Sequence, residues 1–581
     1  MVDRVADVEA RLAGMAEALR QMERRVSALE QGRLTPAAAR RAMRGARDAT
    51  VESIGSDVDA AGRSLSLVGR TLLVLAGAFV LRAFTDSGTF PAAVGVAAGF
   101  VYAGTWVAAA DRAGAAGRKA SAVFHLVAAI AIGFPLLFEA ATRFRLLSPL
   151  AASAMLAAFT GPALAVAARR RHEGLAWVIA FGGILTAIGL MLSAGRMAPP
   201  VCYLVLLGVA TAWMGYVLDW HGLRWPVALV ADVAVLVLAL RAVHPTAGEG
   251  PAVAIGVQVA LMALYLGSFA TRTLLLDREV VPFEMAQTAA VLLVGLGGSA
   301  FVASSADAGE SAIGLVSVAF GLSSYAVAFA FLERRRTVRH ANCHFYASVG
   351  LVFVLAGIAF AFRGWVLPSV AWAVFAVVAG ALARVHGRMT LASHAVAYAV
   401  AGALSSGLLS HAAEALLAAP GTPWEALPPS SLAVMAAIAA TAWFTSFVAP
   451  THPIERAPRL VLVAALAAGV AGIAGGVGAP AGAGPPGAGA SAGAVATVRT
   501  AVLAMGALLL AALGRRDGWV EARWLVYPVL AAVGVKILVE DLARSRPATL
   551  FLAFALYGAT LVLVPRLRRR EAAPPEGAAR A

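Results

Sequence analysis

The chain has 581 residues, of which 60% are hydrophobic and 14% are charged, and its formal net charge is +15 at pH 7. Its mean hydropathy of +0.80 is too apolar for a water-soluble protein, because a globular core of this size cannot bury so much hydrophobic surface. The positive charge does not indicate nucleic-acid binding, because the arginines form short clusters between apolar runs and are not interleaved with aromatic residues. The composition therefore indicates an integral membrane protein.

The first 31 residues carry a heptad pattern. Arg4 and Arg25 fall at g positions, where they can pair with Glu9 and Glu30 at e positions of a parallel partner. We expect residues 1–31 to form a cytoplasmic coiled coil that self-associates or binds a cytoplasmic protein. A single amphipathic helix is the alternative. The predicted seam consists of Val5, Val8, Leu12, Met15, Leu19, Met22, Val26 and Leu29.

Residues 32–64 follow as a predicted juxtamembrane connector helix. Thr35 and Pro36 are typical of a helix start, because proline is well tolerated at the first helical position. The arginines in residues 40–47 can lie on anionic lipid headgroups. A solvated connector is the alternative.

Residues 65–565 are predicted to form an all-α, polytopic bundle of transmembrane helices. Apolar runs of about 20 residues recur there, and each is long enough to cross a hydrocarbon layer of roughly 30 Å. In lipid, a helix satisfies its own backbone polar groups. We expect about 18 spans from these lengths. They are residues 65–84, 90–110, 120–141, 146–168, 174–194, 198–218, 223–243, 251–276, 282–303, 311–333, 341–362, 364–384, 390–412, 428–449, 458–479, 494–514, 519–540 and 546–565.

The cations between these spans predict the orientation. If the N-terminus is cytoplasmic, the cytoplasmic connections hold 20 cations and the opposite ones hold six, as the positive-inside rule requires. The cytoplasmic set is Arg112, Arg118, Lys119, Arg169, Arg170, Arg171, Arg224, Arg272, Arg278, Arg334, Arg335, Arg336, Arg339, Arg384, Arg388, Arg456, Arg459, Arg515, Arg516 and Arg523. The opposite set is Arg143, Arg145, Arg196, Arg363, Arg544 and Arg546. Both termini are then cytoplasmic, including the basic tail 566–581, which we expect to be disordered.

The residue usage suggests the source of the chain. It is rich in alanine and arginine and has only two lysines, Lys119 and Lys536. This bias is typical of a GC-rich bacterial genome. We therefore expect a multi-pass protein of the bacterial cytoplasmic (inner) membrane.

Asp232 stands close to the middle of its predicted span, without a charged partner three or four residues away. A carboxylate at that depth costs about 2.5–3.5 kcal/mol on insertion scales, so it must face another helix or water, or be protonated. We expect either a functional role or a hydrogen bond to a neighbouring helix. Gln258, Glu284 and Gln287 in neighbouring spans can form a polar seam.

Two further charge groups lie near the predicted outer interface. Glu139 and Arg143 are spaced i, i+4, which favours a helix-end ion pair, with an outer vestibule for an anion as the alternative. Lys536 precedes Glu540 by four residues and Asp541 by five. These residues either anchor the helix at the interface or supply the charge of a cavity, since a buried lysine can release a proton where arginine cannot.

Two segments resemble a bacterial family of polytopic membrane proteins called domain of unknown function 2339. Gly182, Gly183, Leu185 and Thr186 match a segment of that family, although Ala187 stands where it usually has proline. Lys536, Asp541 and Leu542 match its C-terminal pattern of lysine, four mostly apolar residues and Asp-Leu, with Glu540 as an additional charge. The resemblance implies a membrane location and an N-terminal heptad region, and it implies no established activity.

No nucleotide-binding loop, nucleophile elbow, metalloprotease motif or dinucleotide fingerprint occurs in the sequence. We expect no metal, no cofactor and no enzymatic activity, with a membrane-embedded transferase as a lesser alternative. The leading expectation is a transporter or flippase-like carrier of an envelope-related molecule or small solute. The alternative is a scaffold or sensor that recruits partners through residues 1–31.

Overall fold

The structure, a computed structural model, describes residues 91–568 and seven isolated earlier positions, residues 20, 23, 24, 27, 76, 77 and 80. Within residues 91–568, the gaps are 194, 245–247, 308, 333–339, 363, 365, 418–426, 451–452, 483–491 and 517. The predicted coiled coil, connector helix and first span lie outside the described residues, apart from those isolated positions. Most of the basic tail also lies outside. The chain divides into two compact units between Val227 and Ala228.

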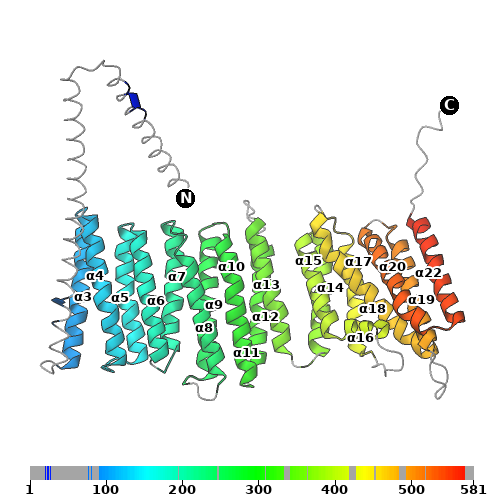
Figure 1. The fold of residues 1–581 in the computed structure, drawn as a ribbon, viewed down its shortest axis with the longest axis horizontal. Coiled ribbons are helices and arrows are strands. Elements are labelled where there is room, and N and C mark those ends of the chain that lie inside the picture. The colour runs from blue at the N-terminus through cyan, green and yellow to red at the C-terminus, as the bar shows by residue number, and fades with distance from the viewer. Residues whose placement is uncertain are drawn as a thin grey trace. The chain divides into compact units, whose positions relative to one another are not determined.

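Where the structure describes it, from residue 91 onward, the first unit contains five consecutive long helices and the start of a sixth (Figure 1). Short turns connect them, and serine or proline stands at several helix starts. For example, the Ser148 hydroxyl accepts a hydrogen bond from the Ala151 N–H and Pro149 follows it. The helices are α3 (Ala92–Ala115), α4 (Lys119–Thr142), α5 (Pro149–Arg169), α6 (Glu173–Ser193), α7 (Ala198–Val217) and α8 (Arg224–Ala242), which crosses the boundary.

The second unit continues the helical pattern, and its described residues include no strand. Four of its long segments contain a π-helical turn, labelled η1, η2, η3 and η5. The elements are α9 (Pro251–Ala270), η1 (Thr271–Leu275), α10 (Pro282–Val291), η2 (Leu292–Gly297), α11 (Gly298–Ser305), α12 (Glu310–Ala326), η3 (Val327–Leu332), α13 (His340–Ala361), α14 (Val366–His386), α15 (Met389–Ser405), α16 (Leu408–Leu417), α17 (Pro429–Thr445), the 3-10 turn η4 (Pro453–Arg456), α18 (Ala457–Gly482), α19 (Ala492–Leu513), α20 (Val520–Lys536), η5 (Ile537–Asp541), α21 (Leu542–Arg544) and α22 (Pro547–Arg568).

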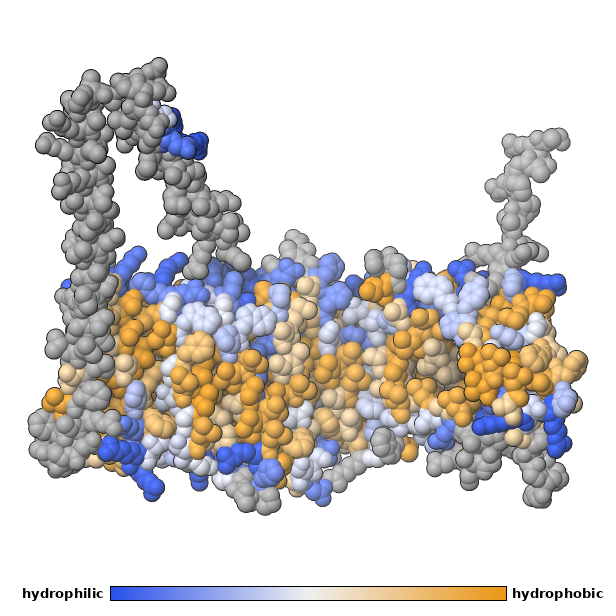
Figure 2. Space-filling view, in the orientation of Figure 1, coloured by the Kyte–Doolittle hydropathy of each residue, from blue (hydrophilic) through white to orange (hydrophobic). Residues whose placement is uncertain are grey.

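Fourteen helical segments of the described chain are long and apolar enough to cross a membrane, or 15 if the bent pair α15–α16 is one span. Hydrophobic residues gather along the middle of the helices and hydrophilic residues gather near their ends (Figure 2). This is the distribution expected of a multi-pass membrane protein.

Each predicted span from residue 90 onward coincides with a helix or with consecutive helices. The total of about 18 spans is not confirmed. One reason is that α17 has only 17 residues. Another is that the predicted span 390–412 is not straight. It breaks into α15 and α16 with a bend of 60°, and Gly407 at the break has a φ of +76° that suits glycine.

Helices α12 and α13 pack closely through their backbones. A Cβ atom added to Gly314 would lie 2.1 Å from the Ala361 backbone nitrogen, and one added to Gly357 would lie 2.8 Å from the Gly314 carbonyl oxygen. Gly321 and Gly350 form a second such contact, at 2.9 Å. Small residues let membrane helices approach closely, and at these four positions even a methyl group would clash with the backbone of the other helix.

Candidate functional site

Four charged side chains meet between α19 and the end of α20. The four-charge cluster consists of Arg499, Lys536, Glu540 and Asp541. Arg499 Nη1 lies 2.8 Å from Glu540 Oε1, and Lys536 Nζ lies 2.7 Å from Asp541 Oδ2 and 3.3 Å from Glu540 Oε2. Two buried cations therefore meet two carboxylates here, and a third, exposed cation, Arg544, lies 3.9 Å from Glu540 Oε1.

The Lys536 ammonium group points into the protein. It donates hydrogen bonds to the Ala496 carbonyl oxygen at 2.6 Å, to Thr500 Oγ1 at 2.8 Å and to Asp541 Oδ2. Only 11% of its side chain is exposed. These three acceptors use all three donors of the ammonium group. The geometry therefore favours an internal charge over the alternative of a lysine that reaches toward the lipid headgroups.

Arg499 is almost fully buried, with 1% of its side chain exposed. Its Nε donates a hydrogen bond of 2.9 Å to the Ala415 carbonyl oxygen, near the C-terminal end of α16. The negative end of that helix dipole stabilises the guanidinium group. The short helix after the break at Gly407 thus supplies part of the cluster.

The π-turn η5 explains why Glu540 and Asp541 both reach Lys536. In a regular α-helix, the residue at i+4 faces residue i and the residue at i+5 has turned away. The wider π-turn brings i+5 back to the same face. Asp541 is fully buried, and its Oδ2 also accepts a hydrogen bond from Thr500 Oγ1 at 3.0 Å.

A second charged group, the Glu521 cluster, lies at the other end of α20. It consists of Glu521, Arg456 and Arg459. Glu521 Oε2 lies 3.4 Å from Arg459 Nη2, and Glu521 Oε1 lies 3.5 Å from Arg456 Nη1. Arg459 also donates to the carbonyl oxygens of Val448 and Gly518. Arg459 is buried and does not behave as the loop cation that the sequence suggested.

Helix α20 therefore carries buried charge at both ends. Glu521 and Lys536 lie about 22 Å apart along the helix axis at 1.5 Å rise per residue. The buried face of this interval is apolar, since Ala522, Val526 and Leu530 pack against residues of α18, α19 and α22, whereas Arg523 is exposed. Pro528 lies within this interval and removes one backbone hydrogen bond from the helix.

Asp232 meets a neutral partner. Nε2 of Gln287 in α10 lies 3.0 Å from Oδ1 and 2.9 Å from Oδ2 of Asp232, whose exposed fraction is 4%. This is the expected hydrogen bond to a neighbouring helix, and its donor is the neutral amide of Gln287.

The other members of the expected polar seam have separate partners. Glu284 accepts from Arg272 Nη1 at 3.0 Å and from the Val281 N–H at 2.9 Å. Gln258 accepts from the Ser299 hydroxyl at 3.1 Å. The three side chains therefore serve three local contacts.

Glu139 and Arg143 lie in the first unit, at the end of α4. Glu139 is half-buried, whereas Arg143 is exposed and lies 5.3 Å from the centre of the Phe144 ring. Asp232 and Lys536 lie in the second unit and make separate contacts, since Asp232 accepts from Gln287 of α10 and Lys536 donates to Ala496 of α19. The structure thus unites Lys536, Glu540 and Asp541 and leaves Asp232 in a contact of its own.

Four residues of the two charged clusters were not predicted as site residues, and they are Arg499, Glu521, Arg456 and Arg459. Arg499 is a lone cation seven residues inside an apolar run, so the criterion applied to Asp232 would have found it. Glu521 and Arg459 carry no comparable signal, because each stands near a predicted span end where charge is ordinary. Their burial depends on contacts between distant segments.

Among the described residues, no group of three or more His, Cys, Asp or Glu side chains is placed to hold a metal ion. Comparisons with known proteins add no assignment. No family model, no curated protein and no solved structure matches the chain. The resemblance to the family of domain of unknown function 2339 stays a prediction.

Proposed function

We propose that this multi-pass membrane protein is a carrier and that α20 is its moving element. The observation that carries the proposal is the pair of ion-pair clusters at the two ends of this helix, with proline and apolar packing between them. Charged residues within membrane segments are costly and commonly mark a transport path.

Ion pairs can hold a transport path closed, because their favourable electrostatic energy depends on direct contact between the two charged groups. When one partner moves away, the remaining buried charge must find water or a ligand, and this makes partial opening unfavourable. Both clusters are formed in the structure. We interpret this arrangement as an occluded state, in which neither end of α20 is released.

The break between α15 and α16 supports the same proposal. Carriers commonly build their binding sites from interrupted helices whose ends supply oriented backbone dipoles. Here the end of α16 contacts Arg499 through the Ala415 carbonyl oxygen. A ligand with an anionic group could replace Glu540 on Arg499 when the cluster opens.

The membrane arrangement is part of the proposal. We place the chain in a bacterial inner membrane with both termini in the cytoplasm, on the basis of its arginine distribution and composition. The Glu521 cluster is then at the cytoplasmic end of α20 and the four-charge cluster is at the outer end. The resemblance to domain of unknown function 2339 agrees with this placement and adds no substrate.

The labelling of single cysteines tests the carrier proposal. In a background of Cys202→Ser and Cys343→Ser, Thr497→Cys reports on the four-charge cluster and Ala522→Cys on the Glu521 cluster. A membrane-impermeant maleimide is applied to right-side-out and inverted vesicles. We expect Asp541→Asn to increase labelling of Thr497→Cys from outside and to decrease labelling of Ala522→Cys from inside.

The matched control is Asp111→Asn, which breaks the half-exposed Arg170–Asp111 pair of the first unit. It should leave both labelling rates unchanged. If Asp541→Asn increases labelling at both reporters, the protein has only loosened. If it changes neither, the clusters are structural and the carrier proposal fails.

A flux assay then tests whether the transported molecule is a lipid. Proteoliposomes contain fluorescent phosphatidylglycerol, whose inner-leaflet pool is protected from dithionite unless lipid crosses the bilayer. A flippase-like carrier should expose that pool, and Arg499→Met should abolish the effect. Absence of lipid movement leaves a small solute as the cargo of the carrier that the labelling experiment tests.

The heptad pattern of residues 1–31 favours a second candidate, a scaffold that recruits a cytoplasmic partner. Deleting residues 1–31 would then abolish function, while neutral replacement of the charges on α20 would be tolerated. A carrier shows the reverse pattern.

A further inference from the structure

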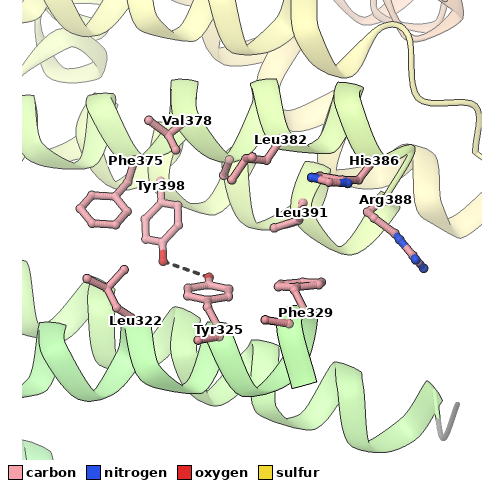
Figure 3. A pocket seen from close by; sticks show the side chains of 13 residues that line it. Leu322, Tyr325, Phe329, Phe375, Val378, Leu382, His386, Arg388, Leu391 and Tyr398 are labelled. Atoms are coloured by element: carbon pink, nitrogen blue, oxygen red, sulfur yellow. Dashed lines mark hydrogen bonds between the residues drawn. The ribbon is translucent and has the colours of Figure 1, made fainter. Parts of the chain in front are cut away.

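A pocket opens between two helical layers of the second unit, away from α20 (Figure 3). Its walls come from α12 and η3 on one side and from α14 and α15 on the other. Its volume is about 370 Å³, which falls at the small end of the usual range for ligand sites. This volume accommodates one hydrocarbon chain more readily than two.

The pocket is lined chiefly by aromatic and aliphatic side chains. Figure 3 shows Leu322 and Phe375 at one end, with Tyr325 and Tyr398 facing each other beside them. The two tyrosine hydroxyls lie 3.0 Å apart, and Tyr325 Oη lies 2.9 Å from His394 Nδ1. Because these polar groups satisfy one another, this end of the pocket offers a ligand mainly apolar contacts.

The opposite end is cationic. His386, the last residue of α14, and Arg388 complete the lining there. Arg388 is also the residue before α15, whose first turn has no side-chain cap. The free N–H groups of that turn and the helix dipole add positive potential beside the arginine.

Two leucines that line this pocket are accessible from outside the protein. Leu322 and Leu382 are 47% and 43% exposed. An amphiphile can therefore enter sideways from the bilayer. Its chain would replace lipid contacts, while its head would stay at the end of the helices where Arg388 lies.

We propose that this pocket binds a single-chain anionic amphiphile, with the hydrocarbon chain against Tyr325, Phe329 and Phe375 and the anionic head on Arg388 and His386. A carboxylate and a phosphate monoester share this chemistry. Both accept hydrogen bonds from a guanidinium group and from helix N–H groups. The proposal concerns residues outside the α20 clusters, so its test does not depend on whether the carrier proposal is correct.

Direct binding tests the proposal on the full chain in phosphatidylcholine nanodiscs. Tritiated palmitate is the probe, and unlabelled palmitate, hexadecyl phosphate and hexadecanol are the competitors. We expect both anions to displace the probe. Hexadecanol should compete at least roughly tenfold more weakly, because it lacks the charge-assisted contacts. The stronger of the two anions identifies a carboxylate or a phosphate as the preferred head.

Variants separate the two ends of the pocket. Arg388→Gln with His386→Gln should weaken palmitate binding by roughly tenfold and leave hexadecanol competition unchanged. Ala330→Trp, which fills the pocket from an exposed position on η3, should abolish binding of both. Arg384→Gln is the matched control, since Arg384 lies over the Phe447 ring and not in the pocket lining.

Equal competition by hexadecanol and palmitate would overturn the anionic head. Unchanged palmitate binding in Ala330→Trp, with the variant folded as judged by its monodisperse elution, would place the ligand elsewhere and overturn the site.

Discussion

Asp232 and Lys536 are both buried charges in apolar helices, but their surroundings differ. Asp232 faces a single neutral amide on α10. Lys536 faces two carboxylates, a hydroxyl group and a carbonyl oxygen, and a second cation completes the balance. The first arrangement lets a carboxyl group be ionised or protonated at little structural cost. The second holds four charges that depend on one another, so a change in one must affect the rest.

The largest effect that separates these regions is expected for Arg499→Met. The substitution leaves Glu540 and Asp541 with one cation in a buried site, which should cost about 3–5 kcal/mol of unfolding free energy. SDS titration of the purified protein measures this loss. Adding Glu540→Gln should recover part of it, because charge balance returns. A double variant no more stable than the single one would show that Arg499 acts through packing instead.

Lys536→Arg should cost less, about 1–3 kcal/mol, although it keeps the charge. A planar guanidinium group cannot place its donors on Ala496, Thr500 and Asp541 as the compact ammonium group does. The same titration, with Lys536→Met beside it, tests this order. If arginine preserves the parent stability and labelling pattern while methionine does not, Lys536 serves as an interfacial anchor.

Asp232→Asn should change stability by less than about 1 kcal/mol. The asparagine oxygen can still accept from Gln287, and the substitution removes the cost of a charge in the membrane. Asp541→Asn, measured under the same conditions, should cost more, because it strands a cation. The reverse order would mean that Asp232 is the charge on which its region depends.

The smallest effect is expected for Asp111→Asn in the first unit. Its partner Arg170 and Asp111 have exposed side-chain fractions of 26% and 33%. A solvent-accessible pair of this kind contributes about 0–1 kcal/mol. High salt should reduce even that contribution, whereas the effect of Arg499→Met should persist at the same salt concentration.

The helices were largely predictable, because length and hydropathy alone determine where a chain can cross a bilayer. The pairing of Lys536 with Glu540 was predictable from their i, i+4 spacing. Asp541 was predicted as a member of the same charge group, but its direct contact with Lys536 was not predictable, since it depends on a π-turn that leaves no recognised mark in VKILVEDL. Arg499 is 41 residues from Glu540, and its contact follows from the packing of α19 against α20. Gln287 was noticed as polar, but only the packing of α10 against α8 identifies Asp232 as its partner.

The scarcity of lysine has a consequence for chemical footprinting. Lys119 is exposed at the start of α4, whereas the amine of Lys536 is held by three internal acceptors. An amine-specific reagent applied to the unmodified chain should therefore report on only two side chains. It should react with Lys536 only while the contacts of the four-charge cluster are broken. Modification of Lys536, read by mass spectrometry against Lys119 as an internal standard, would measure the opening of this cluster in native membranes without any engineered probe.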